Sequence, residues 1–224
     1  MWAVAAVTSC LVLSACGDDE KRDAAQTPPE NAGTGSGLGR ERFEAIDAVY
    51  VASLPIDELR DDAAVDPDAF ASATQRPIAA CNALDRDDPV LAAVRRTCPL
   101  AVQLREQLLR FGACAGGDRG RCLDVIGDLQ RTIAAFERRG RRADRAIARA
   151  GLTPACQDAL TTPPLAYEVF DGYARALALF ERGLATGSAA GVEKAQRVLT
   201  QSAAEGRELP DGRRSLTLFR SGCA

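Results

Sequence analysis

The longest amphipathic segment of this chain runs from Arg119 to Ala150 and constrains the fold most. At 100° per residue, its apolar side chains fall within about 120° of one helix face. The set comprises Cys122, Val125, Ile126, Leu129, Ile133, Phe136, Ala143 and Ile147. Gly140 lies on the same face, where the missing side chain either admits a close neighbour or allows a kink. Gly151 and Pro154 supply stop signals, so the segment predicts a long helix with one buried face.

Further segments with helical periodicity surround this helix. The expected helices span residues 40–54, 68–84, 90–96, 99–111, 154–162, 165–185, 189–206 and 212–220. The 90–96 helix is expected to break before Pro99, because proline removes a backbone donor and clashes with the preceding turn. No stretch alternates with period two, so a sheet is not expected. The predicted fold class is therefore all-α, a disulfide-stapled helical bundle of about six to eight helices.

An apolar segment from Trp2 to Leu13 precedes the helical region. It has the length of a signal-peptide core and is too short to span a bilayer as a helix. Leu13-Ser14-Ala15-Cys16 closes the segment and resembles the lipobox of bacterial lipoproteins. The resemblance implies cleavage after Ala15, a diacylglycerol thioether on Cys16 and often an acyl group, such as palmitate, on its amine. An ordinary secretory signal or a buried helix is the alternative.

The resemblance also implies a location. Cys16 would be anchored in the bacterial cell membrane with the protein facing the extracytoplasmic side, or in the outer membrane where the organism has one. With two or more acyl chains such an anchor is stable, since each buried methylene contributes about 0.8 kcal/mol.

Residues 16–39 form the next unit. They are rich in Asp, Glu, Pro, Gly, Ser and Thr, which is typical of a flexible, disordered tether. Five acids and two bases in this stretch account for the whole net charge of −3. The remaining domain is therefore neutral, which argues against nucleic-acid partners. The predicted organisation is a signal peptide at 1–15, a lipidated cysteine and tether at 16–39, and an α-helical domain at 40–224.

The cysteine count supports export. Cys10 would leave with the signal peptide and Cys16 would carry lipid, so six of the eight cysteines remain for three disulfides. These six are Cys81, Cys98, Cys114, Cys122, Cys156 and Cys223. The helix after Cys98 holds it about 24 Å from Cys114, beyond disulfide reach. The glycine-rich turn between Cys114 and Cys122 favours a disulfide between these two. A Cys81–Cys98 bridge would tie the preceding helix to the hairpin that this turn forms. Elimination leaves Cys156–Cys223 as the third pair.

A cluster of arginines lies opposite the apolar stripe of the 119–150 helix. Arg138, Arg141, Arg142, Arg145 and Arg149 fall within about 100° of arc, and we call this set the arginine face. Each guanidinium offers a forked donor suited to phosphate or carboxylate, as in an anionic polymer or lipid headgroups. The alternative is a solvated face, or one that pairs with the acidic segment described next.

Acidic residues gather in two places. One cluster comprises Asp57, Glu58, Asp61, Asp62, Asp66 and Asp68, and the other comprises Asp85, Asp87 and Asp88. The first lacks the spacing of a calcium loop, and in both places acids at helix starts, which stabilise the helix dipole, are the preferred interpretation. Because the chain has no histidine and no C-x2-C pair, no zinc or other metal site is expected.

The 165–185 helix carries four aromatic side chains, Tyr167, Phe170, Tyr173 and Phe180. All except Tyr167 follow its narrow apolar stripe. Plain core packing explains this pattern better than an aromatic ligand pocket.

The absence of histidine excludes serine–histidine and cysteine–histidine nucleophiles. No G-x-S-x-G, phosphate-loop or S-x-x-K motif is present either. The expectation is a non-enzymatic binding or scaffolding module at the bacterial envelope, without a cofactor. One alternative is a ligand- or anionic-polymer-binding protein that uses the arginine face, and a carboxylate-pair hydrolase is more remote. The expected partners are the membrane, through Cys16, and another envelope protein or an anionic wall polymer.

Overall fold

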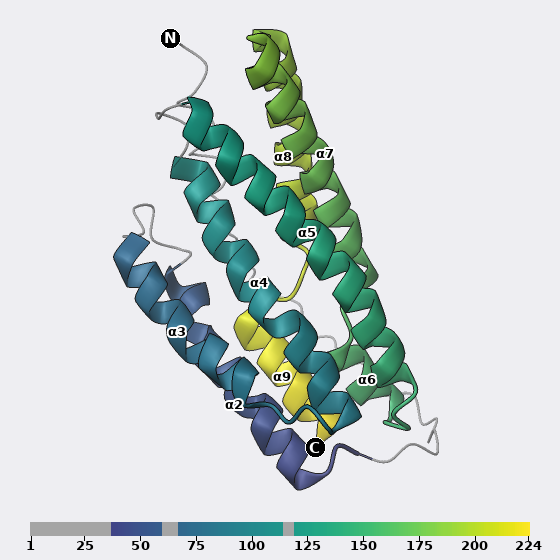
Figure 1. The fold of residues 1–224 in the computed structure, drawn as a ribbon. Coiled ribbons are helices and arrows are strands. Elements are labelled where there is room, and N and C mark those ends of the chain that lie inside the picture. Colours follow the sequence, from purple (N-terminus) through teal and green to yellow (C-terminus); the bar gives the residue numbers. More distant parts are fainter. Residues whose placement is uncertain (1–36, 60–66, 114–118) are drawn as a thin grey trace, which may run out of the picture.

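The structure is a computed structural model that describes residues 37–59, 67–113 and 119–224. Within these ranges the chain forms eight helices and no strand, so the predicted all-α class is confirmed (Figure 1). The helices are α2 (Arg40–Leu59), α3 (Pro67–Ala83), α4 (Pro89–Ala113), α5 (Arg119–Ala148), α6 (Pro154–Leu160), α7 (Pro164–Thr186), α8 (Ala189–Gly206) and α9 (Gly212–Cys223). Cys16 and the predicted signal peptide lie outside the described residues.

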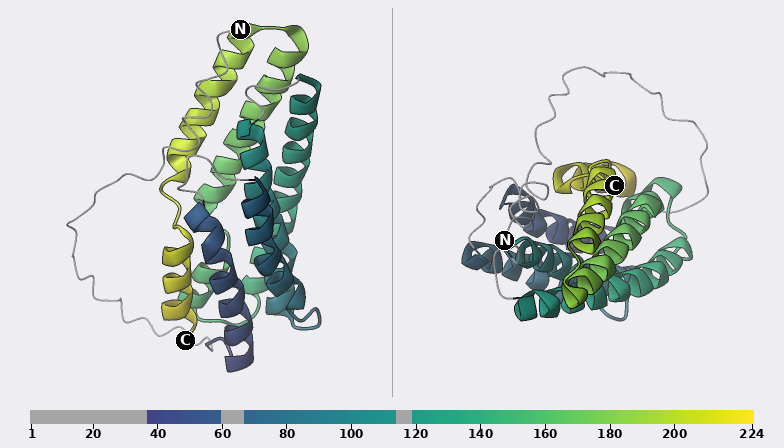
Figure 2. Two further views of the ribbon diagram at one scale, coloured as in Figure 1. Left: turned by 90° about the vertical axis from the view of Figure 1, so that its left-hand side faces the viewer. Right: turned by 90° about the horizontal axis from the view of Figure 1, so that it is seen from above.

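The long helices pack side by side as a bundle. α4 packs along α5, and α7 packs along α8 after a tight turn at Gly187 (Figures 1 and 2). α2 packs against α3 and α9, and the short α6 also lies against α9. α5 contacts α4, α6 and α7, and, like α4, it contributes residues to both of the large core clusters.

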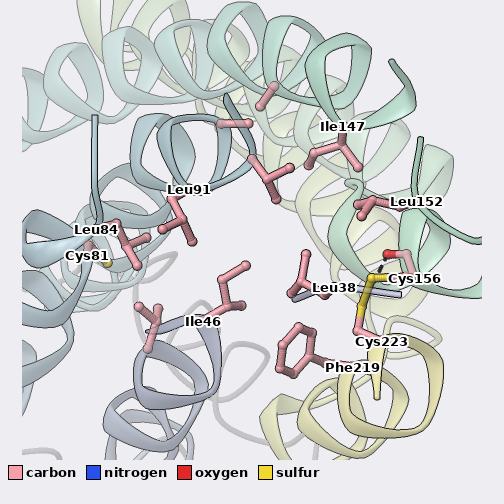
Figure 3. Close-up of a cluster of buried hydrophobic side chains, with 14 of the residues drawn as sticks. Leu38, Ile46, Cys81, Leu84, Leu91, Ile147, Leu152, Cys156, Phe219 and Cys223 are labelled. Carbon is pink, nitrogen blue, oxygen red and sulfur yellow. Dashed lines mark hydrogen bonds between the residues drawn. A yellow bond between two sulfur atoms is a disulfide. The ribbon is translucent and has the colours of Figure 1, made fainter. Parts of the chain in front are cut away.

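Ile56 and Val102 form a small buried cluster between α2 and α4, and two larger clusters make up the rest of the core. One joins α2, α3, α4, α5, α6 and α9 and includes Ile46, Ile147 and Phe219 (Figure 3). The other joins α4, α5, α7 and α8 and includes Leu129 and Leu177. The apolar stripe predicted for α5 is buried along most of its length, at Ile126, Leu129, Ile133, Phe136, Ala143 and Ile147. The helix therefore has a fixed rotation, which turns its opposite face outward.

Two of the predicted disulfides are present. Cys81 bonds to Cys98 with their Cα atoms 5.9 Å apart, and Cys156 bonds to Cys223 with their Cα atoms 4.5 Å apart. The second bridge lies at the edge of the first core cluster, beside Phe219 (Figure 3). Cys122 is also disulfide-bonded, and its predicted partner Cys114 lies outside the described residues.

The predicted break before Pro99 is wrong, because α4 runs from Pro89 through Pro99 to Ala113. A proline inside a helix costs about 3 kcal/mol. Apolar burial on both sides offsets this cost: Leu91 packs in one core cluster and Leu104 in the other, and each buried leucine contributes about 1.5–3 kcal/mol. α2 likewise passes through Pro55 and ends at Leu59, a turn beyond the expected end.

The helix starts follow the capping residues. Thr153, Ser188 and Asp211 cap α6, α8 and α9 with side-chain oxygens. At the start of α4, Asp88 accepts hydrogen bonds from the N–H groups of Val90 and Leu91 at 2.9 and 3.0 Å. This confirms the helix-start interpretation for Asp88. The side chains of the Asp57–Asp68 cluster lie outside the described part of the chain.

Candidate anion-binding face

The five side chains of the arginine face are all exposed; four lie on the second half of α5, and Arg149 follows directly after the helix. Phe136, Ala143 and Ile147 on the opposite side of the same half-helix are buried, and this burial points the arginines to solvent. Arg138 and Arg149 are eleven residues apart, so the face extends about 16 Å along the helix axis. It is a linear array of cations on a rigid element.

None of the five arginine side chains forms an ion pair or hydrogen bond with another residue that the structure describes. Elsewhere, opposite charges one turn apart close into pairs, as in Arg40–Glu44 on α2 and Glu193–Arg197 on α8. Within the described residues, pairing with acids therefore does not occupy the arginine face.

Arg141 has a neighbour of a different kind. Its guanidinium carbon lies 4.4 Å from the ring centroid of Tyr167, a cation–π contact between α5 and α7. Tyr167 is buried, and its hydroxyl donates a hydrogen bond of 2.6 Å to Oδ2 of Asp144. Oδ1 of Asp144 accepts a second bond, of 3.0 Å, from the N–H of Thr162. The carboxylate one turn from Arg141 is thus held by α7 and the loop before it.

Gly140 makes room for this arrangement. A Cβ at this position would lie 2.6 Å from the Tyr167 hydroxyl oxygen, closer than any real contact. Of the two roles expected for this glycine, the structure shows the close neighbour. Burial, and next the hydrogen bond to Asp144, raise the pKa of Tyr167 to about 12, so the hydroxyl keeps its proton and remains a donor at neutral pH.

The other aromatic residues of α7 pack in the core, as predicted. The rings of Phe170 and Phe136 are 5.0 Å apart, and those of Phe180 and Phe111 are 5.4 Å apart. Tyr167, the residue off the stripe, is the exception. Its sequence position predicts only an aromatic side chain off the α7 stripe, whereas the structure brings it to the arginine face together with Asp144.

A groove of about 450 Å³ lies between α4 and α5. Its lining includes Leu100 and Val125 but is mostly polar, unlike the apolar pockets that bind most small molecules. Both acids that line it are paired within their own helices, Glu106 with Arg110 and Asp128 with Arg131. The groove thus lacks the unpaired cations that distinguish the arginine face.

The part of the chain that the structure describes holds no cluster of three or more cysteine, aspartate or glutamate side chains arranged to bind a metal ion. None of its helices is long and apolar enough to cross a membrane. Comparisons with protein-family models, curated proteins and solved structures gave no match to this chain.

Proposed function

We propose that this protein is a lipid-anchored, non-enzymatic binding module on the extracytoplasmic side of a bacterial membrane, and that its arginine face binds an anionic polymer of the envelope. The lipobox-like sequence ending at Cys16 supports the anchor. The disulfide-bonded helical domain fits an oxidising compartment. Scaffolding is the less specific expectation and stays a prediction.

The observation that carries the proposal is the row of exposed, unpaired guanidinium groups. Apart from the adjacent Arg141 and Arg142, successive arginines of the face are three or four residues apart, which separates them by about 4.5–6 Å along the axis. A linear polymer with repeated phosphate or carboxylate groups can meet several of them at once, and each guanidinium fork matches such an anion in geometry. A single small anion would use only part of this array.

Charge reversal tests the proposal. The full chain is bound to immobilised linear polyphosphate, and retention is measured between about 50 and 200 mM salt. Arg141→Glu/Arg142→Glu/Arg145→Glu should abolish retention. The matched control reverses three exposed arginines on other elements, Arg76→Glu/Arg86→Glu/Arg182→Glu, and should keep most of it.

Three outcomes contradict the proposal. If the wild-type chain is not retained, the polymer assignment is wrong. If both triple variants lose retention equally, net charge and not the arginine face governs binding. If anionic liposomes bind through the arginine face and polyphosphate does not, the ligand is a lipid headgroup.

A further inference from the structure

We infer that Tyr167 is a positioning residue for this site, and that it makes Arg141 the preformed anchor of the arginine face. The inference rests on the proposed function and adds two roles that the arginines alone do not reveal. Tyr167 supports the guanidinium of Arg141, and it holds the nearest competing carboxylate, Asp144, away from that guanidinium.

The first role follows from the stacking contact. The Arg141 guanidinium lies over the buried Tyr167 ring at 4.4 Å, while its side chain stays exposed and makes no hydrogen bond to another described residue. Stacking uses the plane of the guanidinium and leaves its N–H donors for an anion. Arg138, Arg142, Arg145 and Arg149 have no such contact in the described residues. Arg141 therefore loses the least side-chain entropy when an anion binds.

The second role follows from the hydrogen bonds of Asp144. An acid and an arginine three residues apart readily pair on a helix, and Asp128 and Arg131 do so earlier on α5. Asp144 stands three residues after Arg141 but is held by the Tyr167 hydroxyl at 2.6 Å and the Thr162 N–H at 3.0 Å. These bonds satisfy the carboxylate, so Arg141 has no ion pair with it. Without the tyrosine hydroxyl, Asp144 is free to turn to Arg141 and occupy the donors that the polymer needs.

Tyr167→Phe removes only the hydroxyl and tests the second role. We expect this variant of the full chain to bind linear polyphosphate about two- to fivefold more weakly, the effect of one exposed ion pair. Adding Asp144→Asn removes the competitor and should restore affinity to the wild-type level or above. The matched control adds Glu137→Gln, which changes net charge equally at the acid four residues before Arg141, and should restore less.

Asp144→Asn alone checks the same step from the other side: its amide oxygen can still accept the hydrogen bond from the Tyr167 hydroxyl, while its NH2 group gives up the bond from the Thr162 N–H. We expect affinity equal to or higher than wild type. Thermal unfolding of each variant separates binding from stability: a merely structural role for Tyr167 predicts no rescue by Asp144→Asn. Unchanged affinity in Tyr167→Phe, or equal rescue by Glu137→Gln and Asp144→Asn, overturns the second role.

The anchor is tested within the arginine face. Arg141→Ala and Arg145→Ala remove the same charge, but only the first removes a stacked guanidinium, and we expect its loss of affinity to be about two- to tenfold larger. With tyrosine-selective isotope labelling, the Tyr167 ring signals should shift on polyphosphate addition, while those of Tyr50 and Tyr173 serve as internal references. Equal losses in the two variants, or no shift at Tyr167, contradict the anchor. Absence of any wild-type binding overturns the proposed function as well, whereas wild-type binding without these differences overturns the anchor alone.

Discussion

Gly140→Ala is the sharpest test of the contact between α5 and α7. In an isolated helix, replacing glycine by alanine stabilises by about 1 kcal/mol. Here the new Cβ would lie 2.6 Å from the Tyr167 hydroxyl oxygen, and 3.4 Å from the Cε1 and Cζ atoms of its ring. Tyr167 must move, and its hydrogen bond to the charged Asp144 is lost. Such a bond contributes about 1.5–3 kcal/mol, so the net change should be a destabilisation of about 0.5–2 kcal/mol.

The same substitution should have the opposite sign in a Tyr167→Phe background. Without the hydroxyl, the closest remaining ring atoms are at 3.4 Å, an ordinary van der Waals contact, and the helix preference of alanine is regained. The coupling between the two substitutions should then be about 1.5–3 kcal/mol, well above the 0.3–0.5 kcal/mol by which independent sites depart from additivity.

Urea unfolding of the full chain, followed by far-ultraviolet circular dichroism, gives the free energies for this cycle. Gly127→Ala is the matched control, because it lies on the same helix and its nearest neighbour is the flexible end of Arg131, at 3.5 Å. It should stabilise by up to about 1 kcal/mol. If Gly140→Ala stabilises as Gly127→Ala does, or if the Tyr167→Phe background leaves its effect unchanged, the Tyr167 hydroxyl does not occupy the space above Gly140.

Two further predictions concern stability. Replacing Cys156 and Cys223 by serine opens a loop with a sequence separation of 67, which should cost about 4 kcal/mol of stability and lower the melting temperature by roughly 10 °C. The Cys81/Cys98 double variant, with a separation of 17, should cost only about 3 kcal/mol. Equal melting temperatures for wild type and both variants would contradict this prediction. The side-chain hydrogen bond from Arg220 holds the pKa of Asp47 below its usual value, although burial acts in the opposite direction. The pair therefore stabilises the fold above the unfolded pKa of about 4 and loses that contribution as pH falls through the lower folded value. The stability difference between wild type and Asp47→Asn should shrink below a pH of about 4, and a difference independent of pH would refute it.

The helices could be predicted because their signals are local. The α5 stripe repeats every three to four residues, and the caps at Thr153 and Ser188 lie where the sequence places them. Pro99 shows the limit of that reasoning. Its local preference ends a helix, but the burial of Leu91 and Leu104 in two separate clusters depends on residues far away in the chain. The cost of the proline is evident from the local sequence, but it is outweighed by long-range packing, which helical periodicity does not reveal.

The candidate site was likewise only partly predictable from the sequence. The exposure of the arginines follows from the position of the apolar stripe, so sequence was sufficient for it. The absence of an ion pair between Arg141 and Asp144 was not predictable, because it depends on donors 18 and 23 residues beyond Asp144 in the sequence. A weak signal was present: Gly140 interrupts the apolar face one turn before Asp144, and Tyr167 is the aromatic residue outside the α7 stripe. The missing side chain at Gly140 on α5 leaves the space that the side chain of Tyr167 on α7 occupies.

The two groups that hold Asp144, Tyr167 and Thr162, both lie near the start of α7. Whether Asp144 is kept away from Arg141 on the arginine face therefore depends on the position of that start. Thr162 lies two residues after the end of α6, and α6 is fixed to α9 by the buried Cys156–Cys223 disulfide. Thr153 adds a hydrogen bond of 3.4 Å to the Gly222 carbonyl between the same two elements. A disulfide that closes one end of the bundle therefore also positions the donor that occupies Oδ1 of Asp144. Movement of α6 would release a carboxylate beside Arg141, so the Cys156→Ser/Cys223→Ser variant should also bind linear polyphosphate more weakly than wild type; unchanged affinity in the folded variant would contradict this link.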